Sequence, residues 1–271
     1  MQGNIVSPGI DITAAHPARM YDYYLGGRDN YAADRKAADG VIALFPDTPL
    51  IAAENRAFMR RATAALVREE GIRQFIDLGS GLPTADNLHE VAQRTASGIR
   101  VVYVDNDPMV LAHGRALLEG NGDTRVITAD LGDPDRLLAD PGLTELIDFS
   151  RPVGLMMLSV LHFVEGDLAP LLARYRSRLA PGSHLALSHV TAEQADATRA
   201  ALVENTYRST NTALTYRTRD EIAALFTGCD LLPPGLVPTW RWRPDPDGAT
   251  RPGAAHPTAP AVLAGVGRVV P

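Results

Sequence analysis

The chain of 271 residues has a single cysteine, Cys229, and no long uninterrupted apolar run. One cysteine permits neither an internal disulfide nor a zinc site built from cysteines. The most apolar stretch, residues 153–164, contains Ser159 and His162 and is far shorter than the ~20 residues that span a bilayer. The amino terminus lacks a basic segment followed by an apolar one, so no secretory signal is expected. We therefore predict a cytoplasmic protein without a membrane partner.

An excess of positive charge is also absent. The formal net charge is −6 at pH 7, whereas nucleic-acid-binding domains usually carry enough Lys and Arg to neutralise phosphates. We therefore predict no nucleic-acid partner. The composition, 45% hydrophobic and 21% charged, is that of an ordinary globular protein with a buried core.

Two kinds of pattern divide the chain. Residues 1–71 contain helical patterns over 17–25, 31–44 and 51–70 and no strand-like run, which predicts an N-terminal helical cap or lid. Residues 72–271 alternate short apolar runs with helical stretches, which predicts a parallel sheet covered on both faces.

The predicted strands comprise five that alternate with helices and two late ones. They are residues 75–78, 100–104, 125–128, 153–158, 184–189, 231–237 and 261–269. Helices are also expected over 192–207 and 219–226. Residues 241–260, rich in Pro, Asp and Gly, are expected to form an exposed loop. This loop leaves no room for a crossover helix, so the last two strands are expected to pair antiparallel.

A glycine-rich turn follows the first predicted strand. Glycines there let backbone N–H groups approach a ligand, and the amino end of the next helix favours an anionic group. A purely structural turn is the alternative, but the strand–turn–helix context favours ligand binding. The expected ligand-binding residues of this turn are Asp77, Gly79, Ser80, Gly81 and Thr84, with Thr84 as the N-cap of the next helix.

A second acidic residue ends the next predicted strand. Asp105 follows Gly79 by 26 residues, close to the spacing of a carboxylate that accepts the hydroxyl groups of a ribose. Asp105 could instead cap the helix that opens at Pro108, but Asp107 suits that role better. We therefore expect Asp105, with Asn106 beside it, to contact a nucleoside.

Two features favour S-adenosylmethionine over a nicotinamide dinucleotide. The dinucleotide fingerprint has a third glycine or alanine where this chain has Thr84. Asp77 would repel a phosphate, whereas a carboxylate attracts an amino or sulfonium group. The alternative for Asp77 is a carboxylate that accepts nearby backbone N–H groups. Asp130 and Leu131, after the third strand, are placed to contact adenine, because ligands of open α/β sheets bind at the carboxyl ends of the strands.

Several blocks of the sequence resemble a bacterial family of S-adenosylmethionine-dependent methyltransferases, formerly catalogued as a domain of unknown function. The blocks are ARMYDYYLGGRDNY at residues 18–31, ENRAFMRR at 54–61, QFIDLGSGLPT at 74–84, VVYVDNDP at 101–108, ADL at 129–131, LHF at 161–163 and PGSHLALSH at 181–189. The resemblance covers nearly the whole chain. It implies the class I methyltransferase fold: a three-layer α/β sandwich with a seven-stranded, mostly parallel sheet and an antiparallel terminal hairpin.

The resemblance also implies the cofactor and its contacts. S-adenosylmethionine is the expected methyl donor, S-adenosylhomocysteine the product, and an unidentified small molecule the acceptor. Cofactor contacts are implied at Asp77, Gly79, Gly81, Asp105, Asp130 and Leu131.

Candidate catalytic and lid residues lie outside the glycine turn. His162 follows the fourth strand and is the candidate general base, although a structural histidine is the alternative. Ser159 lies nearby and is expected to contact the cofactor, and His189 is a weaker candidate base. A lid that shelters a sulfonium would need aromatic faces and hinge glycines, and a helix packed on the sheet is the alternative. The candidate lid residues are Tyr21, Tyr24, Gly26, Arg28, Asn30 and Tyr31.

Other assignments are weaker. Asp105, Asp107 and Asp130 could suggest a divalent metal, but no acidic pair follows the fourth strand, so no metal is expected. Arg56, Arg60 and Arg61 are expected to form a solvated helix face. A regulator that binds S-adenosylmethionine without catalysis, or a nicotinamide-dependent oxidoreductase, are the alternative functions.

Overall fold

A computed structural model describes residues 11–84, 86–118, 122–210, 212–244 and 261–270. Its centre is one sheet with the strand order β3-β2-β1-β4-β5-β8-β6, and β7 pairs with β8 beside this path. The pairs within β3-β2-β1-β4-β5 are parallel, and β8 runs antiparallel to β5, β6 and β7. The strands are β1 Gln74–Leu78, β2 Arg100–Asp105, β3 Thr124–Thr128, β4 Gly154–Leu158, β5 His184–Thr191, β6 Cys229–Leu231, β7 Val237–Pro238 and β8 Ala261–Val269.

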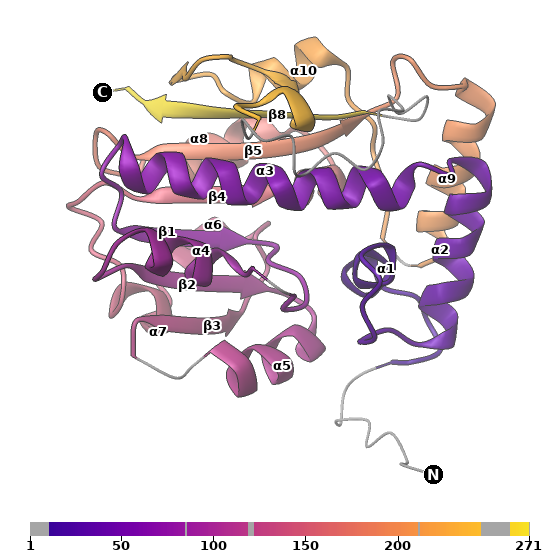
Figure 1. The fold of residues 1–271 in the computed structure, drawn as a ribbon, viewed down its shortest axis with the longest axis horizontal. Helices are drawn as coiled ribbons and strands as arrows, with labels where there is room; N and C mark the ends of the chain where they lie inside the picture. The colour runs from indigo at the N-terminus through magenta and orange to yellow at the C-terminus, as the bar shows by residue number, and fades with distance from the viewer. Residues whose placement is uncertain (1–10, 85, 119–121, 211, 245–260, 271) are drawn as a thin grey trace.

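Helices cover both faces of the sheet, which gives the predicted three-layer α/β sandwich (Figure 1). One face packs against α6 (Pro134–Leu138), α7 (Pro141–Thr144), α8 (Leu168–Arg176) and α10 (Arg219–Ala224). The other packs against α3 (Thr48–Arg68), α4 (Leu88–Thr95) and α5 (Pro108–Leu118). Short 3-10 turns, η1 (Leu161–Phe163) and η2 (Thr239–Arg241), complete the elements.

Three helices lie together beyond one end of the sheet (Figure 1). They are α1 (Pro17–Tyr24), α2 (Ala32–Leu44) and α9 (Ala197–Arg208), and they share a separate apolar cluster that includes Met20, Val41, Val203 and Tyr207. Helix α9 therefore joins the N-terminal helices, although it comes from the second half of the chain.

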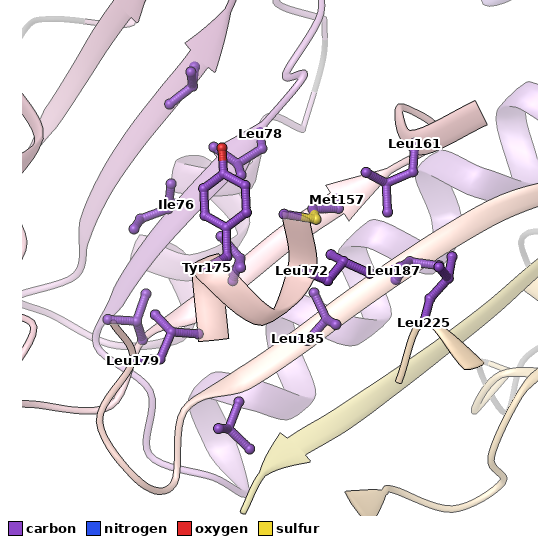
Figure 2. Packing of buried hydrophobic residues seen from close by; sticks show 14 of the residues in the cluster. Ile76, Leu78, Met157, Leu161, Leu172, Tyr175, Leu179, Leu185, Leu187 and Leu225 are labelled. Carbon is purple, nitrogen blue, oxygen red and sulfur yellow. The ribbon is translucent and has the colours of Figure 1, made fainter. Parts of the chain in front are cut away.

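The core shows why the buried strands are apolar on both sides. Side chains alternate along a strand, so Ile76 and Leu78 of β1 fall on one face and Phe75 on the other. Figure 2 shows Ile76 and Leu78 packed with Leu172 and Tyr175 of α8. By the same alternation, Asp77 shares the face of Phe75, which α3 covers.

Three local predictions were wrong. The segment 231–237 is not one strand, because the proline pair Pro233-Pro234 lies between β6 and β7 and proline cannot donate to the ladder. Thr84 is not the N-cap of α4. The helix begins after Asn87, whose backbone N–H donates to Glu90. The helix expected over 192–207 begins only at Ala197.

The long predicted loop also needs a correction. Trp242 is fully buried against Phe58 of α3, with ring centroids 5.3 Å apart, so the loop is not exposed at its start. Arg61 is buried too, and donates to the carbonyl oxygens of Thr239 and Trp242 at 2.7 and 2.9 Å. The expected solvated face of α3 is therefore wrong at Arg61. Residues 245–260 of the predicted loop lie outside the described residues.

Candidate functional site

A cavity of about 290 Å³ lies at the carboxyl ends of β1, β2 and β4, between the sheet and the helices α1, α2 and α9. This is where the chain switches from winding toward β2 to winding toward β4, the usual ligand position in open α/β sheets. The predicted site residues that line this cavity are Tyr21, Tyr24, Asp77, Gly79, Ser80, Gly81, Asp105, Asn106, Asp130, Leu131, Ser159 and His162.

The glycine-rich turn is held in a conformation that favours glycine. Gly79 and Gly81 have φ angles of +70° and +66°, where a side chain is strained. A Cβ atom on Gly79 would lie 2.2 Å from Cγ2 of Val160, so this position has no space for one. The N–H groups of Gly79 and Ser80 both donate to the carbonyl oxygen of Val104, at 2.8 and 3.1 Å. The turn is thus tied to the end of β2.

Asp105 connects this turn to the start of α5. Its Oδ2 accepts the Gly81 N–H and its Oδ1 accepts the Asp107 N–H, each at 2.9 Å. Burial raises the pKa of Asp105, and these two hydrogen bonds oppose that rise. Asp107 in turn accepts the N–H of Met109 at 2.9 Å, so Asp107 is the capping residue, as expected. Asp105 is left on the cavity wall with further lone pairs for hydroxyl donors.

Asp77 is a buried carboxylate with a raised pKa. It is 8% exposed, and burial raises its pKa to about 7, with Arg56 of α3 opposing and Asp105 adding to the rise. Within the described part of the chain no hydrogen bond reaches this carboxylate, so the alternative role as an acceptor of backbone N–H groups finds no support. A cation in the cavity would stabilise the ionised form of Asp77.

The third strand contributes Asp130 and Leu131 at the rim. Asp130 is exposed and accepts the Gly132 N–H at 2.7 Å. The ring of Tyr175 belongs to the core shown in Figure 2. Its hydroxyl donates to the carbonyl oxygen of Leu131 at 2.7 Å. Core packing therefore fixes the backbone at this edge of the cavity.

His162 and Ser159 lie on the turn after β4. Ser159 has a φ angle of +52°, and its N–H donates to the carbonyl and hydroxyl oxygens of Ser188 at 3.1 and 2.9 Å. His162 is 6% exposed, and its Nδ1 has no hydrogen-bond partner among the described residues. Burial, then the charges of His189 and Arg217, lower the pKa of His162 well below its usual range. His162 is therefore neutral at pH 7.

Arg217 donates hydrogen bonds to the backbone of this turn. Its guanidinium donates to the carbonyl oxygens of Leu161 and Val164 at 3.1 and 3.3 Å, and to Nε2 of His189 at 2.8 Å. Burial lowers the pKa of His189 to about 4. His189 does not line the cavity and is occupied by Arg217 and by the carbonyl oxygen of Val190, which its Nδ1 contacts at 2.8 Å.

Some predicted residues lie away from the cavity. Gly26, at φ +77°, follows the end of α1, and Arg28 is exposed. Asn30 is buried and donates to Asp22 at 2.8 Å and to the carbonyl oxygen of Gly27 at 3.1 Å. These residues shape the connection between α1 and α2 without lining the cavity.

Tyr31 and Thr84 also lie away from it. The N–H of Tyr31 donates to Asp34, and its ring packs against the cluster of Leu82, Met109 and Val110. The N–H of Thr84 donates to Asn87.

Two groups of cavity residues were not predicted from the sequence. Helix α3 contributes Thr48, Ile51, Asn55, Arg56 and Met59, and the region of α9 and the segment after it contributes Val203, Tyr207, Thr212, Leu214 and Tyr216. The ENRAFMRR block contained the only available signal for Asn55 and Arg56, whereas the second group carries no motif.

Among the described residues, no cluster of His, Cys, Asp and Glu could hold a metal ion. No helix in the described ranges is both long and apolar enough to cross a membrane.

The order of strands, the glycine turn and the acidic strand ends together define a class I methyltransferase fold. The sequence matches the model of the S-adenosyl methyltransferase family over residues 4–270, and the chain belongs to this family. It is accordingly an S-adenosylmethionine-dependent methyltransferase. A comparison with curated protein sequences finds no match.

Solved structures agree with this assignment. A DUF574 family protein from Streptomyces avermitilis is 40% identical, with a TM-score of 0.90 over 96% of this chain and 99% of its own. A putative methyltransferase from Thermobifida fusca is also 40% identical, with a TM-score of 0.88 over 97% of this chain and 98% of its own. An S-adenosylmethionine-dependent methyltransferase from Anabaena variabilis, 14% identical with a TM-score of 0.51 over 78% of this chain and 84% of its own, shares the fold.

The cavity fits this cofactor chemically. A desolvated carboxylate, Asp77, suits a ligand with positive charge, and Asp105 offers free lone pairs to hydroxyl donors. Gly79 and Gly81 have positive φ angles, which favour glycine, and they present no side chain to the same surface.

Proposed function

We propose that this methyltransferase acts on a small-molecule acceptor, held in the cavity between the strand ends and the helices α1, α2 and α9. The proposal is carried by one observation: the carboxylates of Asp77, Asp105 and Asp130 line a single cavity that continues beneath these helices. Bound S-adenosylmethionine supplies an electrophilic methyl group on a sulfonium. The task of the protein is then to align an acceptor with that group and to exclude water.

In this proposal each acidic residue has a separate partner. Asp77 attracts the positive charge of the amino-acid portion, Asp105 accepts the ribose hydroxyl groups, and Asp130 with Leu131 borders the adenine. Gly79, Ser80, Gly81, Asn106 and Ser159 form the remaining wall. Support comes from the low exposure of Asp77 and Asp105, each 8% exposed, because a buried carboxylate is costly to maintain and a cationic or hydrogen-bonding ligand offsets that cost.

The N-terminal helices act as a lid in this proposal. Tyr21 and Tyr24 line the cavity from α1, and the pKa of Tyr21 is raised by burial. Closing helices over a methyl donor would exclude water, which could otherwise compete with the acceptor.

Calorimetric titration of S-adenosylhomocysteine tests the cofactor assignment. We expect Asp105→Asn to weaken binding by about tenfold or more, the contribution of one charged hydrogen bond. Asp220→Asn, which removes an exposed carboxylate on α10, is the matched control and should bind as the unmodified protein does. Equal affinities for all three proteins would refute the ribose assignment.

A further inference from the structure

The cavity extends from the acidic strand ends into a compartment lined by apolar and aromatic side chains, which we term the acceptor chamber. Its walls come from α1, α2, α9, the turn after β4 and the segment after α9. The residues that define it are Tyr24, Phe45, Phe163, Val203, Tyr207 and Leu214. All six belong to, or pack against, one apolar cluster, so the chamber is a continuous surface.

The acceptor chamber carries no formal charge among its described lining residues. The Asp and Arg residues that line the whole cavity are Asp77, Asp105, Asp130 and Arg56. The three carboxylates lie at strand ends, and Arg56 acts electrostatically on Asp77. An ionised ligand group placed in the acceptor chamber would lose its hydration without gaining a counter-ion, which is unfavourable. The chamber therefore selects against anions and against protonated amines.

A histidine lines the same cavity next to this chamber. His162 packs edge-on against Phe163, with ring centroids 4.3 Å apart. The ring centroids of Phe163 and Tyr207 are 5.4 Å apart. The buried Nδ1 of His162 has no accessible surface and no partner among the described residues, so a ligand in the cavity can reach the imidazole only through Nε2. A neutral imidazole has one ring nitrogen that accepts a proton, and burial, followed by the effects of His189 and Arg217, lowers the pKa of His162 and favours this neutral form.

We propose that the acceptor is an uncharged, mainly apolar molecule, methylated on a hydroxyl group whose proton His162 accepts. This inference rests on the proposed function. A bond forms between the hydroxyl oxygen and the methyl carbon while the carbon–sulfur bond breaks, and sulfur keeps the electron pair. The proton moves to Nε2 of His162, so the positive charge passes from the sulfonium to His162 and then to water.

Binding of matched probes to the protein saturated with S-adenosylhomocysteine tests the chemical class. The probes are 1-naphthol, naphthalene, 1-naphthoate and 1-naphthylmethylamine, measured by calorimetry. We expect 1-naphthol to bind about tenfold or more tightly than the anion and the ammonium ion. Tighter binding of either ion, or no binding of 1-naphthol, overturns the inference. Failure of S-adenosylhomocysteine itself to bind would instead refute the proposed function.

His162→Phe tests the histidine while keeping an aromatic ring in its place. We expect this variant to bind 1-naphthol about tenfold more weakly and naphthalene unchanged, because only the hydroxyl loses a partner. Equal changes for both probes overturn the role of His162. Leu214→Trp, which narrows the acceptor chamber, should weaken the binding of both probes and leave the binding of S-adenosylhomocysteine unchanged. Unchanged probe binding in this variant would place the probes elsewhere and overturn the chamber assignment.

Turnover separates proton transfer from binding. With S-adenosylmethionine and 1-naphthol, the unmodified protein should form 1-methoxynaphthalene, detected by mass spectrometry. His162→Phe should lower kcat by about 100-fold or more, a typical contribution of a general base, with a much smaller change in KM. Binding of 1-naphthol without formation of the ether, or an unchanged kcat in the variant, overturns the assignment.

Discussion

The buried carboxylate of Asp77 should reduce the stability of the cofactor-free protein, and Asp77→Asn should therefore stabilise it. The folded protein holds the pKa of Asp77 at about 7 because the side chain is buried, whereas the ordinary value is 3.8. Folding then favours the protonated form. Stability is retained at low pH and falls as the pH rises from about 4 to about 7.

The size of this effect follows from the two values. At about 1.4 kcal/mol per pH unit, the difference amounts to about 4 kcal/mol above pH 7. An asparagine amide in the same place would leave polar atoms unsatisfied, at a cost of about 1–3 kcal/mol. The net gain at pH 8 is therefore about 2 kcal/mol, which raises the unfolding temperature of a protein of this size by about 5 °C.

Thermal unfolding at pH 4.5 and pH 8, monitored by circular dichroism without cofactor, measures this gain. At pH 4.5 the penalty on Asp77 is only about 1 kcal/mol, no larger than the cost of the asparagine amide, so the variant should be no more stable than the unmodified protein. Asp220→Asn, at an exposed position, should change neither value. A variant that is equally stable to the unmodified protein at pH 8, or equally stabilised at both pH values, would show that Asp77 is not desolvated as the structure indicates.

Further substitutions test the supports of the site. Gly79→Ala should lower the free energy of unfolding by about 2–4 kcal/mol in chemical denaturation, because its Cβ atom would overlap a valine side chain; Gly81→Ala, at a similar φ angle with open space around it, should cost only about 1 kcal/mol. Equal losses would contradict this account. Arg217→Met should speed amide hydrogen exchange in the turn after β4 by about tenfold, because it removes donors to that backbone; unchanged exchange would contradict this. Arg61→Lys should reduce the free energy of unfolding by about 1–3 kcal/mol and lower the unfolding temperature by several degrees, since a lysine ammonium lacks the two separate nitrogens with which Arg61 reaches the two carbonyl oxygens. An unchanged temperature would show that this bridge is dispensable.

Local sequence patterns were sufficient to predict the sheet and the residues at its carboxyl edge. The strands β1 to β5 are short apolar runs, and residues at their ends reach one edge whatever the remainder of the chain does. Asp77, Asp105, Asp130 and His162 could therefore be placed from spacing alone. The length of the loop between the last two strands had already predicted that they pair antiparallel. The family resemblance implied the same pairing.

The walls contributed by distant helices could not be predicted in the same way. Asn55 and Arg56 sit on α3, whose exposed and buried faces depend on where the sheet and α1 pack. Tyr207 and Leu214 reach the cavity only because α9 packs beside α2, more than one hundred and fifty residues away in the chain. Arg61 looked like a surface charge because its two carbonyl partners follow β7, far along the sequence. Each of these positions depends on tertiary contacts rather than on a local pattern.

A chain of hydrogen bonds joins α1 to the turn after β4 by way of Asn55 on α3. The Ser188 hydroxyl accepts the Ser159 N–H and donates to Oδ1 of Asn55 at 2.7 Å. Nδ2 of Asn55 donates to the Tyr21 hydroxyl at 3.0 Å, and this hydroxyl donates to the carbonyl oxygen of Ala52 at 3.0 Å. Moving α1 away from α3 would leave the buried amide of Asn55 without its Tyr21 partner, at a cost of about 1–3 kcal/mol. Ser159 and Tyr21, near the two ends of this chain, both line the cavity. The hydrogen bonds therefore fix the position of α1 relative to the turn after β4, on the opposite side of the cavity.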